Sequence, residues 1–511
     1  MIIKGEDLTV EEVVNVAVRG EKVKLSNIAI EKINNSRRYV EKIIEKGEIV
    51  YGVTTGFGKF CNVVISPEDT KKLQRNLIRS HAAGVGEHFP EEVVRAMMLL
   101  RINALAKGYS GVRLSTLETI IKMLNENIVP LVPSQGSLGA SGDLVPLAHM
   151  VLVMMGEGEA LYKGEVLPGK VALERAGIEP VVFEAKEGLA LINGTQAMTA
   201  LACLSISGAI NLSKAADISG AMTFEALNGI IDAFDEKVQR VRPHRGQRAA
   251  AENMRKLLDK SKFISRQGHY KVQDAYVLRC IPQVHGAVKD ALNHVKNVVE
   301  IEINSATDNP LIFPEEGKII SGGNFHGEPV AINMDYLAIA VSELSNIAER
   351  RIERLVNPSL NEGLPAFLTR NGGLNSGLMI SQYTAAALVS ENKTLSFPAS
   401  VDSIPSSANQ EDHVSMGTIA AKKAWKIVEN TLNVLAIELL CAAQAIDFRF
   451  EEGGCFKDLG KGTKRAYELI RDVVPKIEED RVLSEDIKKL AHLIKSGELV
   501  KRVEEAVGTL E

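Results

Sequence analysis

The segment GSLGASGDLVPLAH (136–149) contains three consecutive small residues, Ala140, Ser141 and Gly142, from which a chain can build its own electrophile. If the amide nitrogen of Gly142 attacks the carbonyl carbon of Ala140, a five-membered ring closes and the Ala140 carbonyl oxygen leaves as water, and loss of the Ser141 hydroxyl as a second water leaves an exocyclic methylidene. Glycine offers an unhindered amide and a permissive backbone, alanine does not obstruct closure, and serine supplies the leaving group. The product would be 4-methylidene-imidazol-5-one (MIO), an electrophile that ordinary side chains do not provide.

Two other interpretations of this segment remain open on local grounds. A phosphate-binding loop would end in Gly-Lys-[Ser/Thr] or follow Gly-x-Gly-x-x-Gly, and the segment does neither. A structural turn would place Ser141 or Asp143 at the N-cap of a helix that begins near Leu144. For an isolated Ala-Ser-Gly-Asp the structural turn is the default, so the rest of the chain must decide.

Composition describes an ordinary globular chain and excludes several classes of protein. Of 511 residues, 45% are apolar and 24% charged, and the net charge of −5 is spread over interspersed acids and bases. We therefore expect neither a nucleic acid nor a membrane surface as partner. The five cysteines are far apart and form no Cys-x-x-Cys pair, which argues against disulfides and a zinc ribbon. The ten histidines include no His-x-x-x-His, so we expect no metal and give a metal-dependent lyase little weight.

The N-terminal sequence and the apolar runs indicate a cytoplasmic location. The first residues, MIIKGEDLTVEEVV, carry early acids and lack the apolar core of a secretory signal. The longest apolar run, Leu144 to Met155, is too short to cross a bilayer and contains proline and histidine. We therefore expect no transmembrane segment.

The second half of the chain has the apolar periodicity of long helices. Apolar residues recur every three or four positions over 284–299 and 337–348, and the segment 415–448 has no proline. Helices of this length normally pack into a bundle. We expect a mainly α-helical protein, with a less regular, mostly helical domain over 1–200 that carries the Ala-Ser-Gly loop, and a long-helix bundle with C-terminal helices over 201–511.

An ordered set of motifs resembles the family of ammonia-lyases and aminomutases that act on histidine, phenylalanine and tyrosine through MIO. Besides 136–149, the matching blocks are YGVTTGFGKF (51–60), AKEGLALINGTQ (185–196), VQDAYVLRCIPQVHGA (272–287), SGGNFHGEPVA (321–331), ERRIERLVNP (349–358), GLPAFL (363–368), GLNSGLMI (373–380) and ANQEDHVSMG (408–417). The resemblance covers nearly the whole chain. It implies MIO formed from Ala140-Ser141-Gly142 with no external cofactor, and a bundle of the aspartase/fumarase-like type. It also implies a homotetramer in which loops of neighbouring subunits complete each active site.

The resemblance also assigns roles that elimination of ammonia requires, namely a base and groups that hold the substrate. Tyr51 is implied as the base, and because a free phenol has a pKa near 10, electropositive surroundings are expected. Arg279 is implied to bind the substrate carboxylate through two parallel hydrogen bonds. Further positions are implied to surround the ring and the substrate, where amide and phenol groups can stabilise negative charge: Asn193, Gln273, Tyr276 and Phe325.

Two positions match the histidine-specific members of the family. His81, in the pair Ser80-His81, and Glu411 occupy places where members specific for phenylalanine or tyrosine resemble other residues. A histidine and a carboxylate can bind both nitrogens of an imidazole, but would leave a phenyl ring facing unpaired polar groups. The resemblance therefore implies elimination of ammonia from L-histidine to give trans-urocanate.

The chain also departs from the histidine-specific pattern. Those members usually read AHPAS where this chain has SFPAS (396–400), so Phe397 replaces a histidine, and Thr54 and Ala275 replace residues common in the family. A phenylalanine or tyrosine ammonia-lyase, or a 2,3-aminomutase, is therefore the alternative. A catalytically silent helical scaffold is a remote one, against which the intact Ala-Ser-Gly triplet counts.

Overall fold

The computed structural model describes residues 1–56, 58–60, 62–66 and 68–511, so Phe57 of the YGVTTGFGKF motif, Cys61 and Pro67 lie outside the described residues. The chain forms two compact units, each assembled from three stretches. Unit 1 comprises 1–207, 296–335 and 398–422, and unit 2 comprises 208–295, 336–397 and 423–511. The expected domains, 1–200 and 201–511, are continuous in sequence and stay a prediction, whereas the compact units are not continuous because long helices carry the chain from one to the other.

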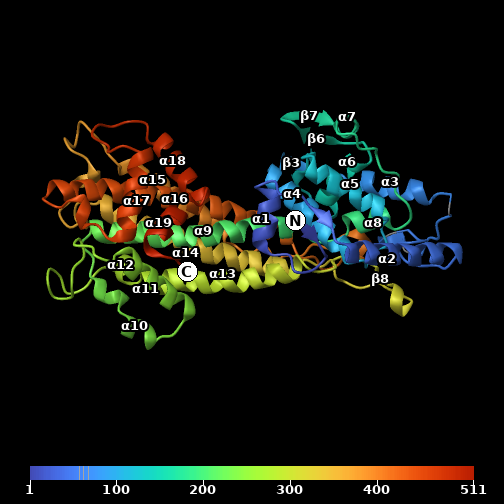
Figure 1. Cartoon of the computed structure of the whole chain (residues 1–511), viewed down its shortest axis with the longest axis horizontal. Helices are drawn as coiled ribbons and strands as arrows, with labels where there is room; N and C mark the ends of the chain where they lie inside the picture. Colours follow the sequence, from blue (N-terminus) through green and yellow to red (C-terminus); the bar gives the residue numbers. More distant parts are fainter. Residues whose placement is uncertain (57, 61, 67) are drawn as a thin grey trace. The chain divides into compact units, whose positions relative to one another are not determined.

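Helices dominate both units (Figure 1). Those within unit 1 are α1 (Val10–Ala17), α2 (Asn27–Glu45), α3 (Thr70–His81), α4 (Glu91–Ala106), α5 (Leu114–Asn125), α6 (Leu144–Met154), α7 (Gly169–Arg175) and α8 (Glu187–Ile192). Those within unit 2 are α10 (Glu236–Arg240), α11 (Arg245–Leu257), α12 (Tyr276–Arg279), α15 (Met379–Leu395), α17 (Lys461–Val473), α18 (Leu483–Lys495) and α19 (Glu498–Val507). Four long helices contribute to both units: α9 (Gln196–Ala226), α13 (Ile281–Glu302), α14 (Glu328–Val356) and α16 (Gly417–Glu451). The predicted mainly α-helical class is confirmed.

The described strands are short and all belong to unit 1. They are β1 (Ile2–Ile3), β2 (Lys24–Leu25), β3 (Val85–His88), β4 (Val129–Pro130), β5 (Pro133–Gln135), β6 (Glu159–Tyr162), β7 (Glu165–Pro168), β8 (Leu311–Phe313) and β9 (Lys318–Ile320). They pair as β1 with β2 in parallel, and as β3 with β5, β4 with β6 and β7, and β8 with β9 in antiparallel. These strands give unit 1 the less regular character that the sequence predicts.

The three segments with helical periodicity form α13, α14 and α16, as predicted. By length and composition α16 is apolar enough to cross a membrane, which the sequence analysis did not recognise, but 89% of its most apolar window is buried inside the protein. In unit 2 this helix also buries Glu438, whose carboxylate accepts from Ser219 Oγ at 2.7 Å and pairs with the Arg351 guanidinium at 2.9 Å. The helix is therefore explained by burial in a protein core, where a charge is tolerated when it is paired.

Helix α4 forms the interior of unit 1. Every residue from Val93 to Ala106 is buried, and α1, α2, α5 and α6 pack around the helix. Such burial requires polar side chains to find partners inside the protein. Arg95 and Arg101 both do so through their guanidinium groups, in different places along the helix.

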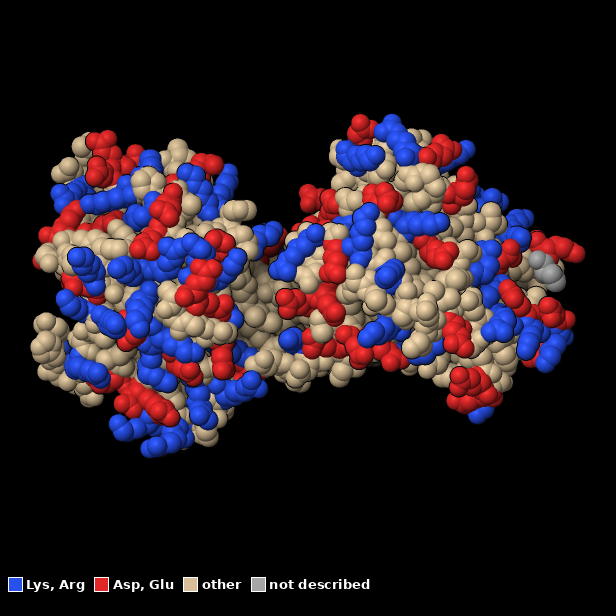
Figure 2. Space-filling model, in the orientation of Figure 1, with Lys and Arg blue, Asp and Glu red and all other residues tan. Residues whose placement is uncertain are grey.

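The face of the molecule drawn in Figure 2 carries both signs of charge. On the face drawn in Figure 2, lysines and arginines lie interspersed with aspartates and glutamates. This face therefore has no extended basic surface of the kind that nucleic acids bind.

Glu225, on the part of α9 within unit 2, generates a prediction about stability and pH. Burial raises the pKa of this carboxyl to about 7, although it accepts a hydrogen bond from Gly460 N at 2.7 Å. Because the folded state favours the protonated form, the stability contributed by this group is complete below the unfolded pKa and is lost as the pH rises through about 7.

Replacement of this residue by a permanently neutral isostere, Glu225→Gln, should remove this loss of stability with rising pH. Between pH 6 and pH 8, the wild type should lose about 1 kcal/mol more unfolding free energy than the variant. Denaturant unfolding at the two pH values measures the difference, with the exposed Glu479→Gln as control. Parallel pH dependence of the wild type and Glu225→Gln would contradict the assignment.

Candidate active site

The Ala-Ser-Gly triplet lies in unit 1, in the connection between β5 and α6. Gly142 has a φ of +72° and forms an isolated parallel bridge with Gly194. A Cβ added at Gly142 would lie 2.1 Å from the Gly194 carbonyl oxygen, closer than any real contact. Glycine is therefore required here on two independent grounds, the left-handed backbone and the contact with a second backbone.

Asp143 anchors the triplet from the residue that follows it. Its carboxylate is fully buried and accepts from the backbone N–H groups of Ala197 and Met198 at 2.9 and 2.8 Å, and from Ser137 Oγ at 2.9 Å. It also accepts from the Thr418 hydroxyl. The Asp143 side chain thus caps the N-terminal turn of α9 from a distant part of the chain.

The structural turn suggested by the sequence would have Ser141 or Asp143 cap α6, and this expectation is wrong. Asp143 occupies the N-cap position of α6, but its side chain makes no cap hydrogen bond to that helix. The Ser141 hydroxyl also points elsewhere, donating to Glu411 Oε1 at 2.9 Å. Local sequence suggests a cap for the following helix, whereas tertiary contacts direct both side chains to other segments.

A cavity of about 750 Å³ opens in front of the triplet. It brings together five of the residues selected from the sequence, which come from separate loops and helices of unit 1: Tyr51, His81, Ser141, Asn193 and Glu411. A cavity of this size is typical of a small-molecule site.

Glu411 belongs to a tight turn, and its carboxylate lies next to the Ser141 hydroxyl. Its Oε2 accepts from Ser406 Oγ at 3.1 Å, and the backbones of Ser406 and Glu411 exchange two hydrogen bonds at 2.9 and 3.3 Å. These contacts fix the carboxylate beside the Ser141 hydroxyl. Removal of that hydroxyl in ring formation would release Glu411 Oε1 from this donor.

His81 lies at the end of α3 and presents a defined tautomer. Its Nδ1 lies 2.8 Å from the carbonyl oxygen of Leu77, which can only accept, so Nδ1 carries the proton of the neutral ring. Burial lowers the pKa of His81, against smaller opposing effects of the Leu77 carbonyl and Glu411. The ring is therefore neutral near pH 7, and Nε2 is a hydrogen-bond acceptor.

Tyr51 begins the turn that borders the cavity. Its ring is half-buried, and its hydroxyl oxygen accepts weakly from Gly58 N at 3.5 Å. Lys59, which the sequence analysis did not select, also lines this cavity, and it is the only lysine or arginine among the described lining residues. Its place in the YGVTTGFGKF motif was the available signal, because a phenol that acts as a base requires a nearby positive charge.

Asn193 ends α8 and is 3% exposed. Its Oδ1 is buried and has no hydrogen-bond partner among the described residues. A buried amide without a partner is costly unless a further group completes it. The glycine contact at Gly142 fits a ring built in place from the triplet, and the buried Asn193 Oδ1 remains available to a donor from outside the described residues.

Four other predicted residues do not line this cavity within the described part of the chain. Gln273 and Arg279 line a separate cavity of about 250 Å³ in unit 2, and the exposed ring of Tyr276 stacks against Arg279, with 4.6 Å from guanidinium carbon to ring centroid. Phe325 is half-buried in the loop before α14. Phe397, the departure from the histidine pattern, is 78% exposed.

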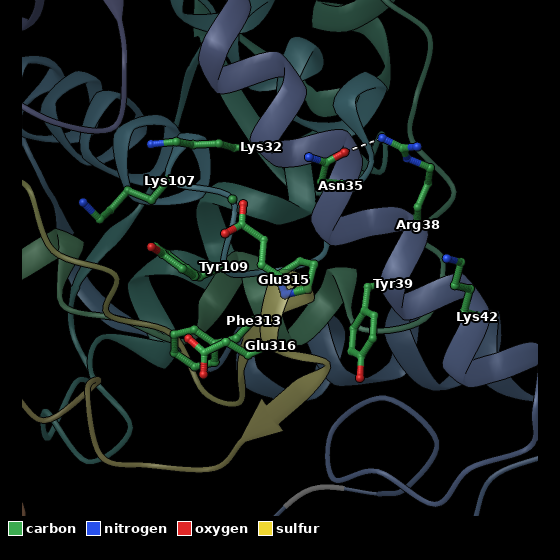
Figure 3. A pocket seen from close by; sticks show the side chains of 12 residues that line it. Lys32, Asn35, Arg38, Tyr39, Lys42, Lys107, Tyr109, Phe313, Glu315 and Glu316 are labelled. Carbon is green, nitrogen blue, oxygen red and sulfur yellow. Dashed lines mark hydrogen bonds between the residues drawn. The ribbon is translucent and has the colours of Figure 1, made fainter.

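A second cavity of unit 1, of about 400 Å³, lies elsewhere on α2 and the β8 region (Figure 3). Its charged lining residues are Lys32, Arg38, Lys42, Lys107, Glu315 and Glu316. None of the residues selected for chemistry is among its described lining residues. The cavity in front of Ser141 is therefore the candidate active site.

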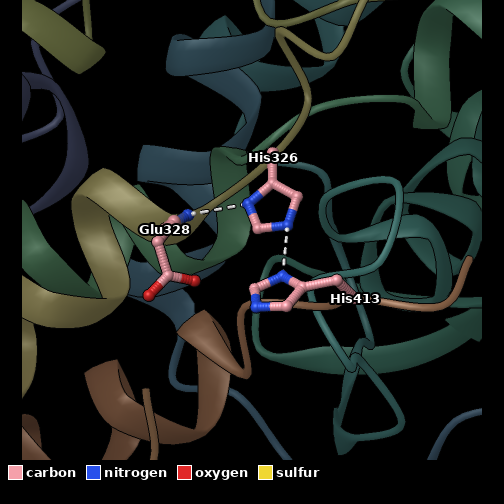
Figure 4. Close-up of side chains that lie close together, drawn as sticks. All are labelled: His326, Glu328 and His413. Atoms are coloured by element: carbon pink, nitrogen blue, oxygen red, sulfur yellow. Dashed lines mark hydrogen bonds between the residues drawn. The ribbon is translucent and has the colours of Figure 1, made fainter. Parts of the chain in front are cut away.

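The side chains of His326, Glu328 and His413 can place ligand atoms within 4.8 Å of one another (Figure 4). The Glu328 N–H donates to His326 Nδ1 at 3.3 Å, so the neutral ring carries its proton on Nε2, which faces His413 Nδ1 at 3.4 Å. Both nitrogens of His326 are engaged, and an ion would have to displace one of these bonds. The absence of a metal stays a prediction.

Comparison with known proteins places this geometry in a family. The family model for aromatic amino acid lyases matches residues 8–472. The histidine ammonia-lyase of Alkaliphilus oremlandii is 60% identical over 507 residues, covering 99% of each chain. The crystal structure of histidine ammonia-lyase from Trypanosoma cruzi has a TM-score of 0.92 at 44% identity, covering 99% of this chain and 95% of that one.

Tyrosine aminomutase from Streptomyces globisporus has a TM-score of 0.95 at 40% identity over the whole of both chains. The predicted long-helix fold is thus confirmed by solved structures with this architecture. The family model spans most of the chain, and the Alkaliphilus relative has more than half of its residues identical over its full length. Both matches agree with the site. The chain belongs to the aromatic amino acid lyase family.

Proposed function

We propose that this protein is a histidine ammonia-lyase, which eliminates ammonia from L-histidine to give trans-urocanate. The observation that carries the proposal is the cavity in which Ser141 faces Glu411 and His81. The full-length relatives at about 60% identity that carry the same name support it. The fold alone does not choose the reaction, because solved aminomutases share it.

The electrophile of this reaction is MIO formed from Ala140-Ser141-Gly142. When formed, it supplies an electron-deficient carbon that converts a poor amine leaving group into a good one. The backbone contact between Gly142 and Gly194 supports ring closure, because it holds the loop in a conformation that only glycine adopts. Asn193 lines the cavity, and its Nδ2 amide group is suited to donate a hydrogen bond to the ring carbonyl.

Tyr51 is the proposed base that removes the β-proton of the substrate. Tyr51 lines the same cavity as Ser141, and Lys59, which also lines it, is proposed to supply the positive charge that favours the phenolate. Because a general base must come within hydrogen-bond reach of the proton it removes, the substrate Cβ must lie next to the Tyr51 hydroxyl.

The pair of His81 and Glu411 selects an imidazole. His81 Nε2 is an acceptor and Glu411 is a carboxylate, so the pocket offers two acceptor groups. A substrate imidazole donates one N–H when neutral and two when protonated. A phenyl ring donates none and would leave both groups desolvated without partners.

The remaining residues reach the substrate from other subunits of a homotetramer. Arg279, Gln273 and Tyr276 belong to unit 2 and are not among the described residues that line the cavity in front of Ser141, and in the proposed assembly a neighbouring copy of the chain supplies them. Exposed apolar residues on α14 support such a contact, since Ile332, Tyr336 and Ile339 are 44 to 54% exposed on one face of that helix. Phe325 is proposed to reach a neighbouring site in the same way.

No nucleic acid or membrane is a partner in this proposal, and the protein acts in the cytoplasm. The alternative, a phenylalanine or tyrosine ammonia-lyase or 2,3-aminomutase, rests on Phe397. It would be favoured by a cinnamate, coumarate or β-amino acid product.

The first test compares the three amino acids directly. Incubated with L-histidine, L-phenylalanine and L-tyrosine in parallel, the purified protein should form a conjugated acid, detected by near-ultraviolet absorbance, from histidine alone. Its intact mass should be two water molecules below that of the encoded chain.

Ser141→Ala should have the encoded mass and no turnover with an unchanged unfolding midpoint, because the methylidene carbon derives from Ser141. Turnover by this variant would contradict the ring.

Glu411→Gln tests the selection of imidazole. Loss of the carboxylate charge should reduce kcat/KM for histidine by roughly 10²-fold, because charged hydrogen bonds are the stronger ones. Ring formation, read by intact mass, should be complete. The adjacent exposed Asp412→Asn is the matched control and should retain wild-type kinetics. Unchanged kinetics of Glu411→Gln would remove Glu411 from the binding pocket.

Mixing of inactive variants tests the shared sites. Tyr51→Phe and Arg279→Met should each be inactive, but tetramers assembled from an equal mixture should regain roughly a quarter of wild-type activity, since a quarter of the sites combine both native residues. Co-refolding followed by the urocanate assay measures the recovery. If Tyr51 and Arg279 of one chain served the same site, the mixture would remain inactive.

A further inference from the structure

Arg101 is a fully buried arginine on α4 that contacts the back of the candidate active site. Its Nη1 donates to the backbone carbonyl of Asn193 at 2.7 Å and to Gln196 Oε1 at 3.0 Å. These two acceptors belong to Asn193, the first residue after α8, and to Gln196, the first residue of α9, so they lie at the two ends of the turn that joins the helices. A single nitrogen therefore holds both ends of this turn.

The turn is also the segment against which the Ala-Ser-Gly triplet is built. The Gly194 carbonyl accepts from Asp143 N at 2.6 Å, and the Gly194 backbone pairs with Gly142. A Cβ added at Gly194 would lie 2.8 Å from Arg101 Nη1. Gly194 is thus enclosed between the guanidinium group and the triplet, so a displacement of Arg101 must move the surface on which the ring closes.

Burial of this cation is energetically unfavourable. Burial lowers the pKa of Arg101 to about 10, so the group stays protonated at neutral pH. The nearby buried ion pair of Lys186 and Asp308, 2.7 Å apart, leaves the three groups with a net positive charge. Arg101 Nε and Nη2 have no hydrogen-bond partner among the described residues. Apolar side chains of similar volume commonly replace buried ions without loss of stability. A contribution to stability therefore does not by itself explain why an arginine is buried here.

We propose that Arg101 is a positioning residue for the active site, which holds the turn from Asn193 to Gln196 in the geometry that ring closure and the Asn193 amide require. The inference rests on the proposed function and deepens it. Arg101 does not line the cavity within the described residues and acts through Asn193 and Gly194.

Arg95 provides a matched control on the same helix. It is 5% exposed, and its guanidinium donates to the backbone carbonyls of Val16, Ala17 and Leu124 at 2.8 to 3.2 Å. Like Arg101, it is a buried arginine that binds main-chain oxygens. Unlike Arg101, it makes no contact with the turn that backs the triplet.

The experiment compares Arg101→Lys with Arg95→Lys in the full-length protein. Lysine keeps the charge but loses the planar fork and the reach of the guanidinium. Both variants should lower the unfolding midpoint to a similar extent. Arg101→Lys alone should leave a large fraction of chains at the encoded mass. In the ring-bearing fraction it should lower kcat by roughly 10²-fold at nearly constant KM, as a small misplacement of reacting groups does.

A second variant keeps the test decisive if Arg101→Lys does not fold. Gln196→Met removes one acceptor of the clamp and leaves Arg101 in place, and it should show the same mass and kcat defects to a smaller degree. Complete ring formation with wild-type kcat in Arg101→Lys, or in Gln196→Met where Arg101→Lys does not fold, would overturn the proposal. Equal defects in Arg95→Lys would also overturn it. A wild-type protein at the encoded mass would instead refute the proposed function.

Discussion

The contact between the backbones of Gly142 and Gly194 is the constraint on which the candidate site depends. It brings two chain segments so close that Gly142 cannot carry a β-carbon, and a β-carbon at Gly194 would meet the side chains of Gln196 and Arg101. Asp143 completes the contact, because its N–H binds the Gly194 carbonyl while its carboxylate caps α9. These bonds hold the loop with the triplet against the start of α9, and this contact places Asn193 at the cavity.

The front of this contact offers acceptors. Glu411 and the unprotonated Nε2 of His81 accept hydrogen bonds, whereas the back of the contact is held by the buried guanidinium of Arg101. The proposed roles separate two tasks: residues in the cavity would select the substrate, and Arg101 behind it would maintain the geometry. A buried positive charge behind the turn also favours negative charge that develops in front of it, because a low-dielectric interior screens charges weakly.

The distribution of predicted residues over the two units accounts for the proposed assembly. Five lie around one cavity of unit 1, whereas Arg279 and Gln273 line another cavity in unit 2. In the proposed function, a neighbouring copy of the chain supplies the carboxylate-binding arginine to the first cavity. Shared sites of this kind couple catalysis to oligomerisation, and isologous contacts between long helices are a common way to build them.

The sequence by itself determined the helical class, three of the four longest helices, the Ala-Ser-Gly triplet and five residues that line the cavity, because apolar periodicity and residue identity are read directly from the sequence. Only the tertiary structure decided that Asp143 caps α9 rather than α6, that Lys59 borders the cavity, and that Arg101 lies behind Asn193. These contacts join residues far apart in the chain, and each depends on how helices pack. No local pattern records such packing, so only the folded chain reveals it.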